Sequence, residues 1–226
     1  MPRALLSACE YLEAILVAVL LAVFTRAFVF QAFEIPSGSM EETLLVGDHV
    51  LVNKFVHARA TGPWRAILPY AEVETGEVIV FRSPERPDLD LVKRVVGRSG
   101  DTLRIEGRSL IRNGRKVEEP WALFRDPPPP GPWLAAPERP REGMPERRVP
   151  AGSVFVMGDN RDDSRDSRTW GPVPQSLVRG RTVLVYWSRA EPGGGPPRTA
   201  GPSRHLDAAL DFLSRTRWSR SFRLVR

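Results

Sequence analysis

Two serines, Ser37 and Ser39, stand on either side of one glycine in the stretch FEIPSGSMEETL, directly after an apolar segment. A serine hydroxyl is a weak nucleophile until a neighbouring base takes its proton. Histidine is the usual base, and the chain contains His49, His57 and His205. None of them lies in a context that resembles a known Ser-His arrangement, and the sequence has no Gly-x-Ser-x-Gly turn. A Ser-His-Asp mechanism is therefore disfavoured.

Lysine is the alternative base, because burial can lower the pKa of its amine from about 10.4 towards neutrality. Only three of the 33 Lys and Arg residues are lysines, and one of them, Lys93, lies in the apolar stretch LDLVKRVVG. Strand alternation would place Leu91 and Val95 on the same face as Lys93. Arginine cannot act as a base at any realistic pH. In isolation, however, one of two adjacent cations would be expected to face solvent.

A second polar stretch, MGDNRDDSRDSRTWGPVP at residues 157–174, is dense in Asp, Asn, Ser and Arg, with Gly158 and Gly171 as turn residues. This composition is typical of a loop that supports a functional site. Taken alone, it is equally compatible with a metal-binding loop, because its carboxylates suit hard cations, or with a solvated turn.

The elements that must position these residues are short and rich in β-branched side chains. With 42% hydrophobic and 27% charged residues, and a formal net charge of +6, the composition excludes a chain that is disordered throughout. Asn113-Gly114 predicts a hairpin turn between two strands. The sequence thus predicts a mostly β domain, with strands at residues 49–55, 77–81, 91–96, 101–105, 153–157 and 181–187.

The N-terminal part has a different character. Residues 14–24 are uninterrupted apolar residues, and the segment 14–33 is broken only by Thr25, Arg26 and Gln31. A membrane helix needs about 20 such residues, so we expect a transmembrane anchor at 14–33 behind a short cytoplasmic segment at 1–13. A cleaved signal peptide and a buried core helix are the alternatives, but the acidic flank opposes the first and the lack of a polar face opposes the second.

Two stretches differ from the rest of the expected catalytic domain at 34–190. Residues 118–150 are rich in Pro and Arg and predict an irregular surface excursion without a function of its own. Residues 191–226 combine a Gly/Pro linker with a basic tail in which Leu206, Leu210 and Leu213 have helical spacing. The tail predicts a short C-terminal helix, either lying on anionic lipid or simply solvated.

In combination, the motifs IPSGSMEETLLVGDHVLVNK, LVKRVVGRSGDTL and GDNRDDSRDSRTWGPVP resemble those of bacterial type I signal peptidases. They cover roughly 50 residues, appear in the family's order and follow an N-terminal apolar segment. The resemblance implies a signal-peptidase-like antiparallel β-sheet domain held outside the cytoplasm at the bacterial inner membrane by a single span. It also implies a serine endopeptidase that removes signal peptides from exported preproteins.

By the same resemblance, Ser39 matches the family's nucleophile and Lys93 its general base. Ser37 matches the residue whose hydroxyl, with the Ser39 backbone N–H, forms the oxyanion hole. Ser164 falls where a serine hydrogen-bonds the lysine, and a supporting ion pair is implied for Asp166 and Arg168. The residues that would line the substrate pockets are Ile35, Met40, Leu44, Leu91 and Val92.

No cofactor or metal is expected, and no nucleic-acid partner. The implied partners are preproteins with signal peptides, the lipid bilayer and the protein export machinery. The chain departs from the family where Glu42 replaces a common proline and Arg165 replaces a smaller residue. Neither position is expected to take part in the chemistry.

Three other functions are compatible with parts of this pattern. A Ser/Lys peptidase of the same fold could mature pilins, and a self-cleaving repressor uses the same pair, although the sequence before Ser39 leaves no room for a DNA-binding helix-turn-helix. A non-catalytic, membrane-anchored module that binds peptides is the third alternative. Substitution of Lys93 separates this module from the enzymes, because binding alone does not need the amine.

Overall fold

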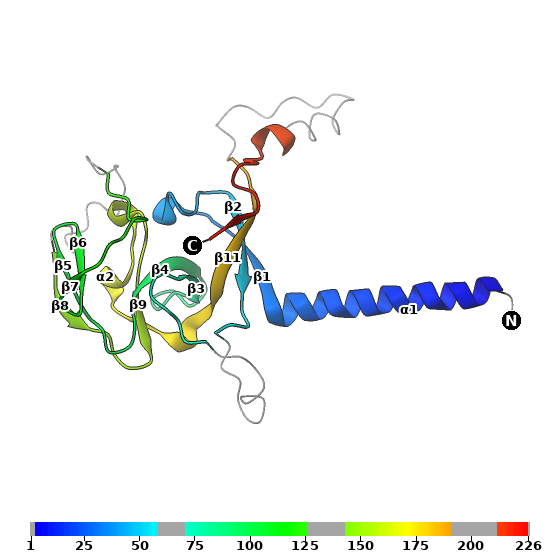
Figure 1. The fold of residues 1–226 in the computed structure, drawn as a ribbon, viewed down its shortest axis with the longest axis horizontal. Helices are drawn as coiled ribbons and strands as arrows, with labels where there is room; N and C mark the ends of the chain where they lie inside the picture. The colour runs from blue at the N-terminus through cyan, green and yellow to red at the C-terminus, as the bar shows by residue number, and fades with distance from the viewer. Residues whose placement is uncertain (1–2, 58–70, 126–142, 191–211, 226) are drawn as a thin grey trace.

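The computed structural model describes residues 3–57, 71–125, 143–190 and 212–225. The described chain is mostly antiparallel β-sheet, with one long helix that extends away from the sheets (Figure 1). This confirms the predicted mostly β, antiparallel domain.

The larger sheet has the strand order β1-β2-β11-β3-β4-β9-β10, and β12 pairs with β11. Both β11 pairings that involve central strands contain register shifts, so β11 bends as it crosses the sheet. The strands are β1 (Phe30–Glu34), β2 (Asp48–Asn53), β3 (Val78–Arg82), β4 (Asp90–Gly97), β9 (Ser153–Met157), β10 (Val173–Pro174), β11 (Val178–Ser188) and β12 (Arg223–Leu224).

The smaller sheet has the order β7-β6-β5-β8, with β5 at Thr102–Glu106, β6 at Ser109–Arg112, β7 at Arg115–Lys116 and β8 at Gly143–Arg148. The predicted Asn113-Gly114 hairpin is confirmed. Both residues have positive φ, 53° and 75°, as the two central residues of a type I′ turn require.

Three buried apolar clusters form the core. Within β3, Val78 and Val80 belong to one cluster while Ile79 and Phe81 belong to another, because successive side chains point to opposite faces of the strand. The third cluster lies under the smaller sheet and includes Leu103. The larger sheet is therefore covered on both faces in the second half of β4, and both Lys93 and Arg94 are buried there although they point to opposite faces.

Helix α1 spans Arg3–Phe24 and continues as a π-helical turn, η1, at Thr25–Val29. The chain then enters β1, which pairs with β2 from Phe30 to Glu34. The expected anchor at 14–33 is thus helical only to Val29, and its last residues belong to the sheet. No helix within the described ranges combines the length and the apolar character that crossing a membrane requires.

The prediction that residues 118–150 form an irregular surface excursion is partly wrong. Residues 143–148 form β8 and complete the smaller sheet, and Leu123 forms a bridge with Asn160. The remainder of the Pro-rich stretch, residues 126–142, lies outside the described residues. The high proline and arginine content of this stretch argued against a strand. Within the described residues, however, β8 pairs on one side only, with β5, and such an edge strand tolerates Pro145.

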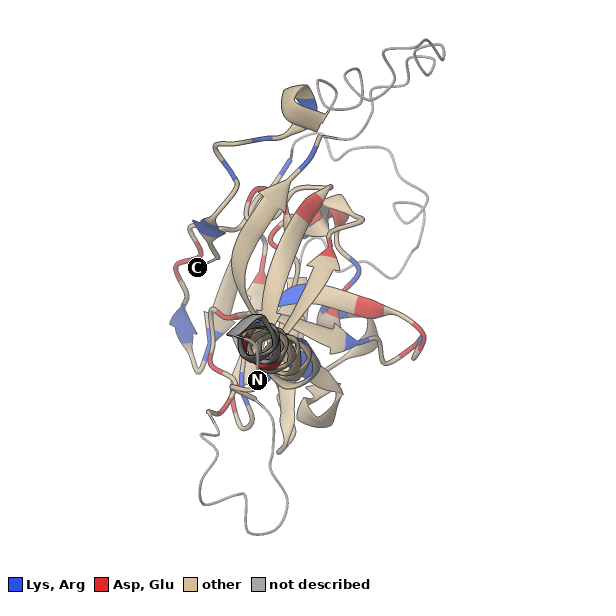
Figure 2. Ribbon diagram, turned by 90° about the vertical axis from the view of Figure 1, so that its right-hand side faces the viewer, with Lys and Arg blue, Asp and Glu red and all other residues tan. Residues whose placement is uncertain are grey.

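The predicted C-terminal helix is only partly described. Residues 212–215 are helical, whereas Leu206 and Leu210 lie outside the described residues. The following residues carry several arginines and run back to the larger sheet (Figure 2), where β12 pairs with β11 and Val225 is buried. The predicted solvated or lipid-bound tail did not include this pairing of the C-terminal residues with the larger sheet.

Candidate active site

Ser39 and Lys93 meet beside β4, an interior strand of the larger sheet. Ser39 lies in a 3-10 turn, η2 (Gly38–Met40), that follows β1, and Lys93 lies in the middle of β4. The Lys93 Nζ atom is 2.5 Å from the Ser39 Oγ atom. The lysine is 4% exposed and Ser39 is half-buried, so the amine reaches the hydroxyl from inside the domain.

Burial lowers the pKa of the Lys93 amine to about 8, although the carboxylates of Asp166, Asp159 and Asp163 act in the opposite direction. A substantial share of the lysine is then neutral near pH 8, and a neutral amine can accept the serine proton. The buried environment of Lys93, which its apolar sequence neighbours predict, is thus present in the structure.

Ser37 is exposed, and its Oγ atom lies 3.5 Å from the Ser39 Oγ atom. The two hydroxyls share one side of the turn because Ser37 is extended and η2 begins immediately after it. Ser37 can therefore reach an oxygen atom that develops beside Ser39.

The Asp166 side chain is fully buried and forms a two-point ion pair with Arg168, with distances of 2.8 and 2.9 Å. Although burial raises the pKa of Asp166, the Arg168 guanidinium outweighs this effect and the pKa is lowered to about 2. The Ser164 hydroxyl donates to Asp166 at 2.7 Å. No hydrogen bond between the described atoms joins Ser164 to Lys93, which differs from the contact that the resemblance implies.

Two residues of the polar loop, the loop at residues 157–174, hold the backbone around Ser39. Asn160 donates its backbone N–H to the Ser39 carbonyl at 3.2 Å and its side-chain amide to the Gly38 carbonyl at 3.1 Å. A Cβ atom on Gly158 would lie 2.5 Å from the Ser39 carbonyl oxygen and closer still to Ser164 Oγ. Glycine is needed here because two segments of the site pack directly against its Cα atom.

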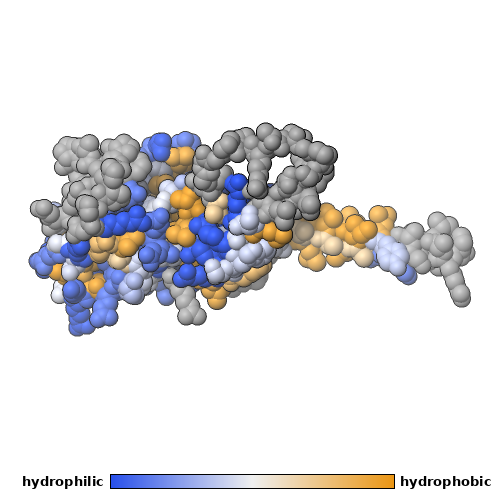
Figure 3. All heavy atoms as spheres, turned by 90° about the horizontal axis from the view of Figure 1, so that it is seen from above, coloured by the Kyte–Doolittle hydropathy of each residue, from blue (hydrophilic) through white to orange (hydrophobic). Residues whose placement is uncertain are grey.

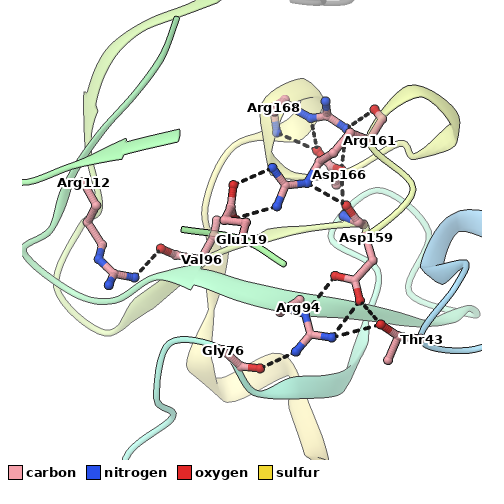
Figure 4. A network of polar contacts seen from close by, with 11 residues as sticks. Thr43, Gly76, Arg94, Val96, Arg112, Glu119, Asp159, Arg161, Asp166 and Arg168 are labelled. Carbon is pink, nitrogen blue, oxygen red and sulfur yellow. Dashed lines mark hydrogen bonds and ion pairs between the residues drawn. The ribbon is translucent and has the colours of Figure 1, made fainter. Parts of the chain in front are cut away.

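A buried ion pair that the sequence did not indicate joins β4 to the loop at residues 157–174 (Figure 4). Arg94 donates through Nε and Nη2 to the two carboxylate oxygens of Asp159, at 2.8 and 2.7 Å, and both side chains are almost fully buried. Thr43 donates to Asp159 at 2.5 Å. Lys93 and Arg94 are therefore both buried, each with its own partner, and the expectation that one of them faces solvent does not apply.

The start of the predicted excursion also contributes to this network. Glu119 forms a two-point ion pair with the buried Arg161, at 2.6 and 2.8 Å, and Trp121 packs 4.4 Å from the Arg94 guanidinium. Arg161 in turn donates to the Gly158 carbonyl. Residues 119–123 therefore support the polar loop, and reading the stretch only as an irregular excursion missed this.

The residues predicted to line substrate pockets are mostly in the core. Ile35, Met40 and Leu44 are at most 2% exposed and form one cluster, against which the partly buried Val92 packs. Leu91 packs against a different cluster, as strand alternation requires. The structure thus does not gather all five side chains around one open pocket.

A serine hydroxyl in contact with a buried amine, with a second hydroxyl beside it, is the arrangement that activates a serine nucleophile. The fold and site define a candidate serine hydrolase.

Comparison with known proteins agrees with this class. Residues 8–187 match the family model described as "Signal peptidase, peptidase S26". The signal peptidase I of Pseudomonas aeruginosa is 35% identical over an alignment that covers 81% of this chain and 74% of that protein, and the one of Aquifex aeolicus is 32% identical, covering 79% and 84%. A signal peptidase I crystal structure from Enterococcus faecalis covers 49% of this chain at 26% identity, with a TM-score of 0.37.

The chain belongs to the signal peptidase family, peptidase S26. It is a serine peptidase, a hydrolase that processes signal peptides.

Proposed function

We propose that Ser39 is the nucleophile and Lys93 the general base of this peptidase. The observation that carries the proposal is the 2.5 Å contact between the two side chains, with the amine buried and its pKa lowered to about 8. As Ser39 Oγ bonds to the scissile carbonyl carbon, its proton passes to Lys93. The carbonyl oxygen becomes negatively charged, and the Ser37 hydroxyl and Ser39 N–H stabilise it.

When the tetrahedral intermediate collapses, the peptide C–N bond breaks and the Lys93 ammonium gives its proton to the departing amine. A water molecule then attacks the acyl-enzyme ester, again with Lys93 as base, and Ser39 regains its proton as the new carboxyl terminus leaves. Ser164, Asp166 and Arg168 form one connected set, and the charges of Asp166 and Arg168 act on the pKa of the Lys93 amine.

The backbone of β4 offers a place for the substrate. β3 pairs with β4 along Asp90–Arg94, whereas β9 pairs with the other side only from Arg94 onwards. The other side of β4 at Leu91 and Val92 therefore has no strand partner within the described residues. An extended preprotein segment that adds there as a strand lies next to Lys93. Small side chains suit this position, since Ile35, Met40 and Leu44 leave little open space.

We propose that α1 and η1 attach the domain to the bacterial inner membrane, with the β domain on the extracytoplasmic side. The support is the apolar surface that Figure 3 shows along the part of α1 nearer the β domain. Leu16, Leu20 and Phe24 are each more than half exposed. An exposed apolar surface of this extent marks contact with lipid or another protein. The lipid bilayer and the export machinery are accordingly the partners proposed for this part of the chain.

The test is cleavage of a preprotein bearing an Ala-x-Ala site by the detergent-purified, full-length chain, followed by mass measurement of the products. Wild type is expected to cut directly after that site, while Ser39→Ala and Lys93→Ala lose cleavage by at least about 10²-fold. Lys93→Arg is the matched control, because it retains a positive charge but cannot deprotonate. Activity in Lys93→Arg close to wild type would refute the proposed base. Turnover of pilin precursors but not of the Ala-x-Ala preprotein would redirect the substrate assignment.

A further inference from the structure

The loop that follows the nucleophile is held by a segment from the far end of the chain. After η2, residues 41–47 lead to β2, and the loop is closed at its base where Gly47 donates to the Ile35 carbonyl and Ile35 donates to the Asp48 carbonyl. Asp48 is fully buried at this closure. Asp48 therefore lies where the chain before the nucleophile, at Ile35, and the end of the loop at residues 41–47 come together.

The Asp48 carboxylate is ionised inside the domain. It accepts hydrogen bonds from the Leu45 N–H at 2.9 Å and the Ser188 hydroxyl at 2.5 Å. Its nearer ion-pair partner is Arg220, whose Nη2 atom is 2.6 Å away, while Arg217 lies 3.7 Å from the other carboxylate oxygen. Although burial raises the pKa of Asp48, the hydrogen bonds, with that from Arg220 the largest, hold it below its usual value. A buried carboxylate that loses its cationic partner becomes a strongly unfavourable charge.

Arg220 has a second contact that lies closer to the reaction. The same Nη2 atom donates to the Thr43 backbone carbonyl at 3.0 Å. The Thr43 side chain donates to Asp159, the neighbour of the Asn160 that holds the Ser39 carbonyl. Thr43 is thus held from one side by the polar loop and from the other by Arg220.

The rest of the C-terminal segment is fixed in a way that keeps Arg220 in position. Arg217 donates to the carbonyls of Val46 and Arg189, at 2.5 and 2.8 Å. Val225 is buried in the same cluster as Met40, the residue next to the nucleophile. These contacts come from residues beyond position 187, where the match to the family model ends.

We propose that Arg220 is a positioning residue for the peptidase reaction, which holds the loop at residues 41–47 so that Ser39 stays aligned with Lys93. The inference rests on the proposed Ser39–Lys93 pair and assigns to the C-terminal segment a part in completing the site. Arg220 does not touch substrate; it acts through Thr43 and Asp48.

The test compares Arg220→Ala and Arg220→Lys with wild type in detergent-purified, full-length protein, with kcat and KM measured on the Ala-x-Ala preprotein well below each unfolding midpoint. Arg223→Ala is the matched control, because this arginine is exposed in the same segment and its side chain has no ion pair within the described residues. We expect kcat of Arg220→Ala to fall about tenfold or more with KM little changed, since a misplacement of about 1 Å can cost about 10²-fold.

Arg220→Lys keeps a charge opposite Asp48 but loses the planar donor fork, so its kcat is expected to lie between those of wild type and Arg220→Ala. Arg223→Ala is expected to match wild type. Unchanged kcat in Arg220→Ala, or in Arg220→Lys if the alanine variant does not fold, would overturn the inference even if the unfolding midpoint drops. Ser39→Ala and Lys93→Ala are measured in parallel. Activity retained in either refutes the proposed pair, whereas their inactivity beside fully active Arg220 variants refutes the positioning role alone.

Discussion

The carboxylate of Asp166 opposes the effect of burial on Lys93. Burial disfavours the charged amine and lowers its pKa to about 8, while the negative charge of Asp166 is the largest of the influences that raise it. The lysine is thereby kept at a pKa from which it can both take a proton from a serine and return it to a leaving amine.

This balance predicts how activity depends on pH. Only the neutral amine can act as base, so kcat/KM is expected to rise as pH increases through about 8 and to level off above it. Asp166→Asn removes a charge that favours protonated Lys93, and we expect it to move the rising limb to lower pH. The measurement is kcat/KM on the preprotein between pH 6 and pH 10. A flat profile while chemistry limits the rate would exclude Lys93 as the base.

Ser37 is expected to affect the transition state more than substrate binding. Its hydroxyl lies 3.5 Å from Ser39 Oγ, beside the position where the carbonyl oxygen becomes charged. Ser37→Ala should lower kcat by about 10²–10³-fold, as loss of one oxyanion donor does elsewhere, with KM little changed. Ser37→Thr retains the hydroxyl and is the control. Equal losses in both variants would point to a steric effect and against a donor role.

Two ion pairs of the polar loop should differ widely in their contribution to stability. Arg168 pairs with a fully buried Asp166, whereas Arg165 pairs with Glu85 at the surface, with side chains 61% and 40% exposed. Arg168→Ala leaves a buried charge without its partner and should reduce the free energy of unfolding by about 3–5 kcal/mol. Arg165→Ala should cost less than about 1 kcal/mol. Urea unfolding of both variants provides the comparison, and similar losses would contradict the assigned roles.

Gly158→Ala is expected to displace the nucleophile. The added methyl group would lie 2.5 Å from the Ser39 carbonyl oxygen, so either the serine turn or the polar loop must move. A displacement of about 1 Å can lower kcat by about 10²-fold. Steady-state kinetics measure this effect, with thermal unfolding to check that the variant remains folded. Wild-type kcat in a folded Gly158→Ala protein would mean that this close packing has no catalytic importance.

Local sequence signals predicted much of the fold. A type I′ turn requires positive φ at both central residues, and Asn113 and Gly114 adopt it readily. The turn can therefore be predicted from these two residues alone, without knowledge of the rest of the fold. Strands such as β9 could be recognised from their own apolar composition. In contrast, β12 consists of Arg223 and Leu224 and exists because β11 offers it a pairing site. No pattern within such a short exposed segment could reveal this.

The site divides in the same way. Ser39 and Lys93 could be proposed from residue type and from the resemblance, although 54 positions separate them. The pairs Arg94–Asp159 and Asp48–Arg220 could not, because their partners are 65 and 172 positions apart and arginine is abundant throughout the chain. The choice of partner for each buried aspartate depends on the sheet order, which the sequence did not provide.

The direct passage from α1 through η1 into β1 has a mechanical consequence. Val29 ends the helical part and Phe30 begins a strand that is paired along its whole length with β2, so no loop separates the two. Few backbone torsions remain that could absorb a change in the direction of the helix. A tilt of α1 would therefore also turn β1, and with it the serine turn at Gly38–Met40 that follows this strand.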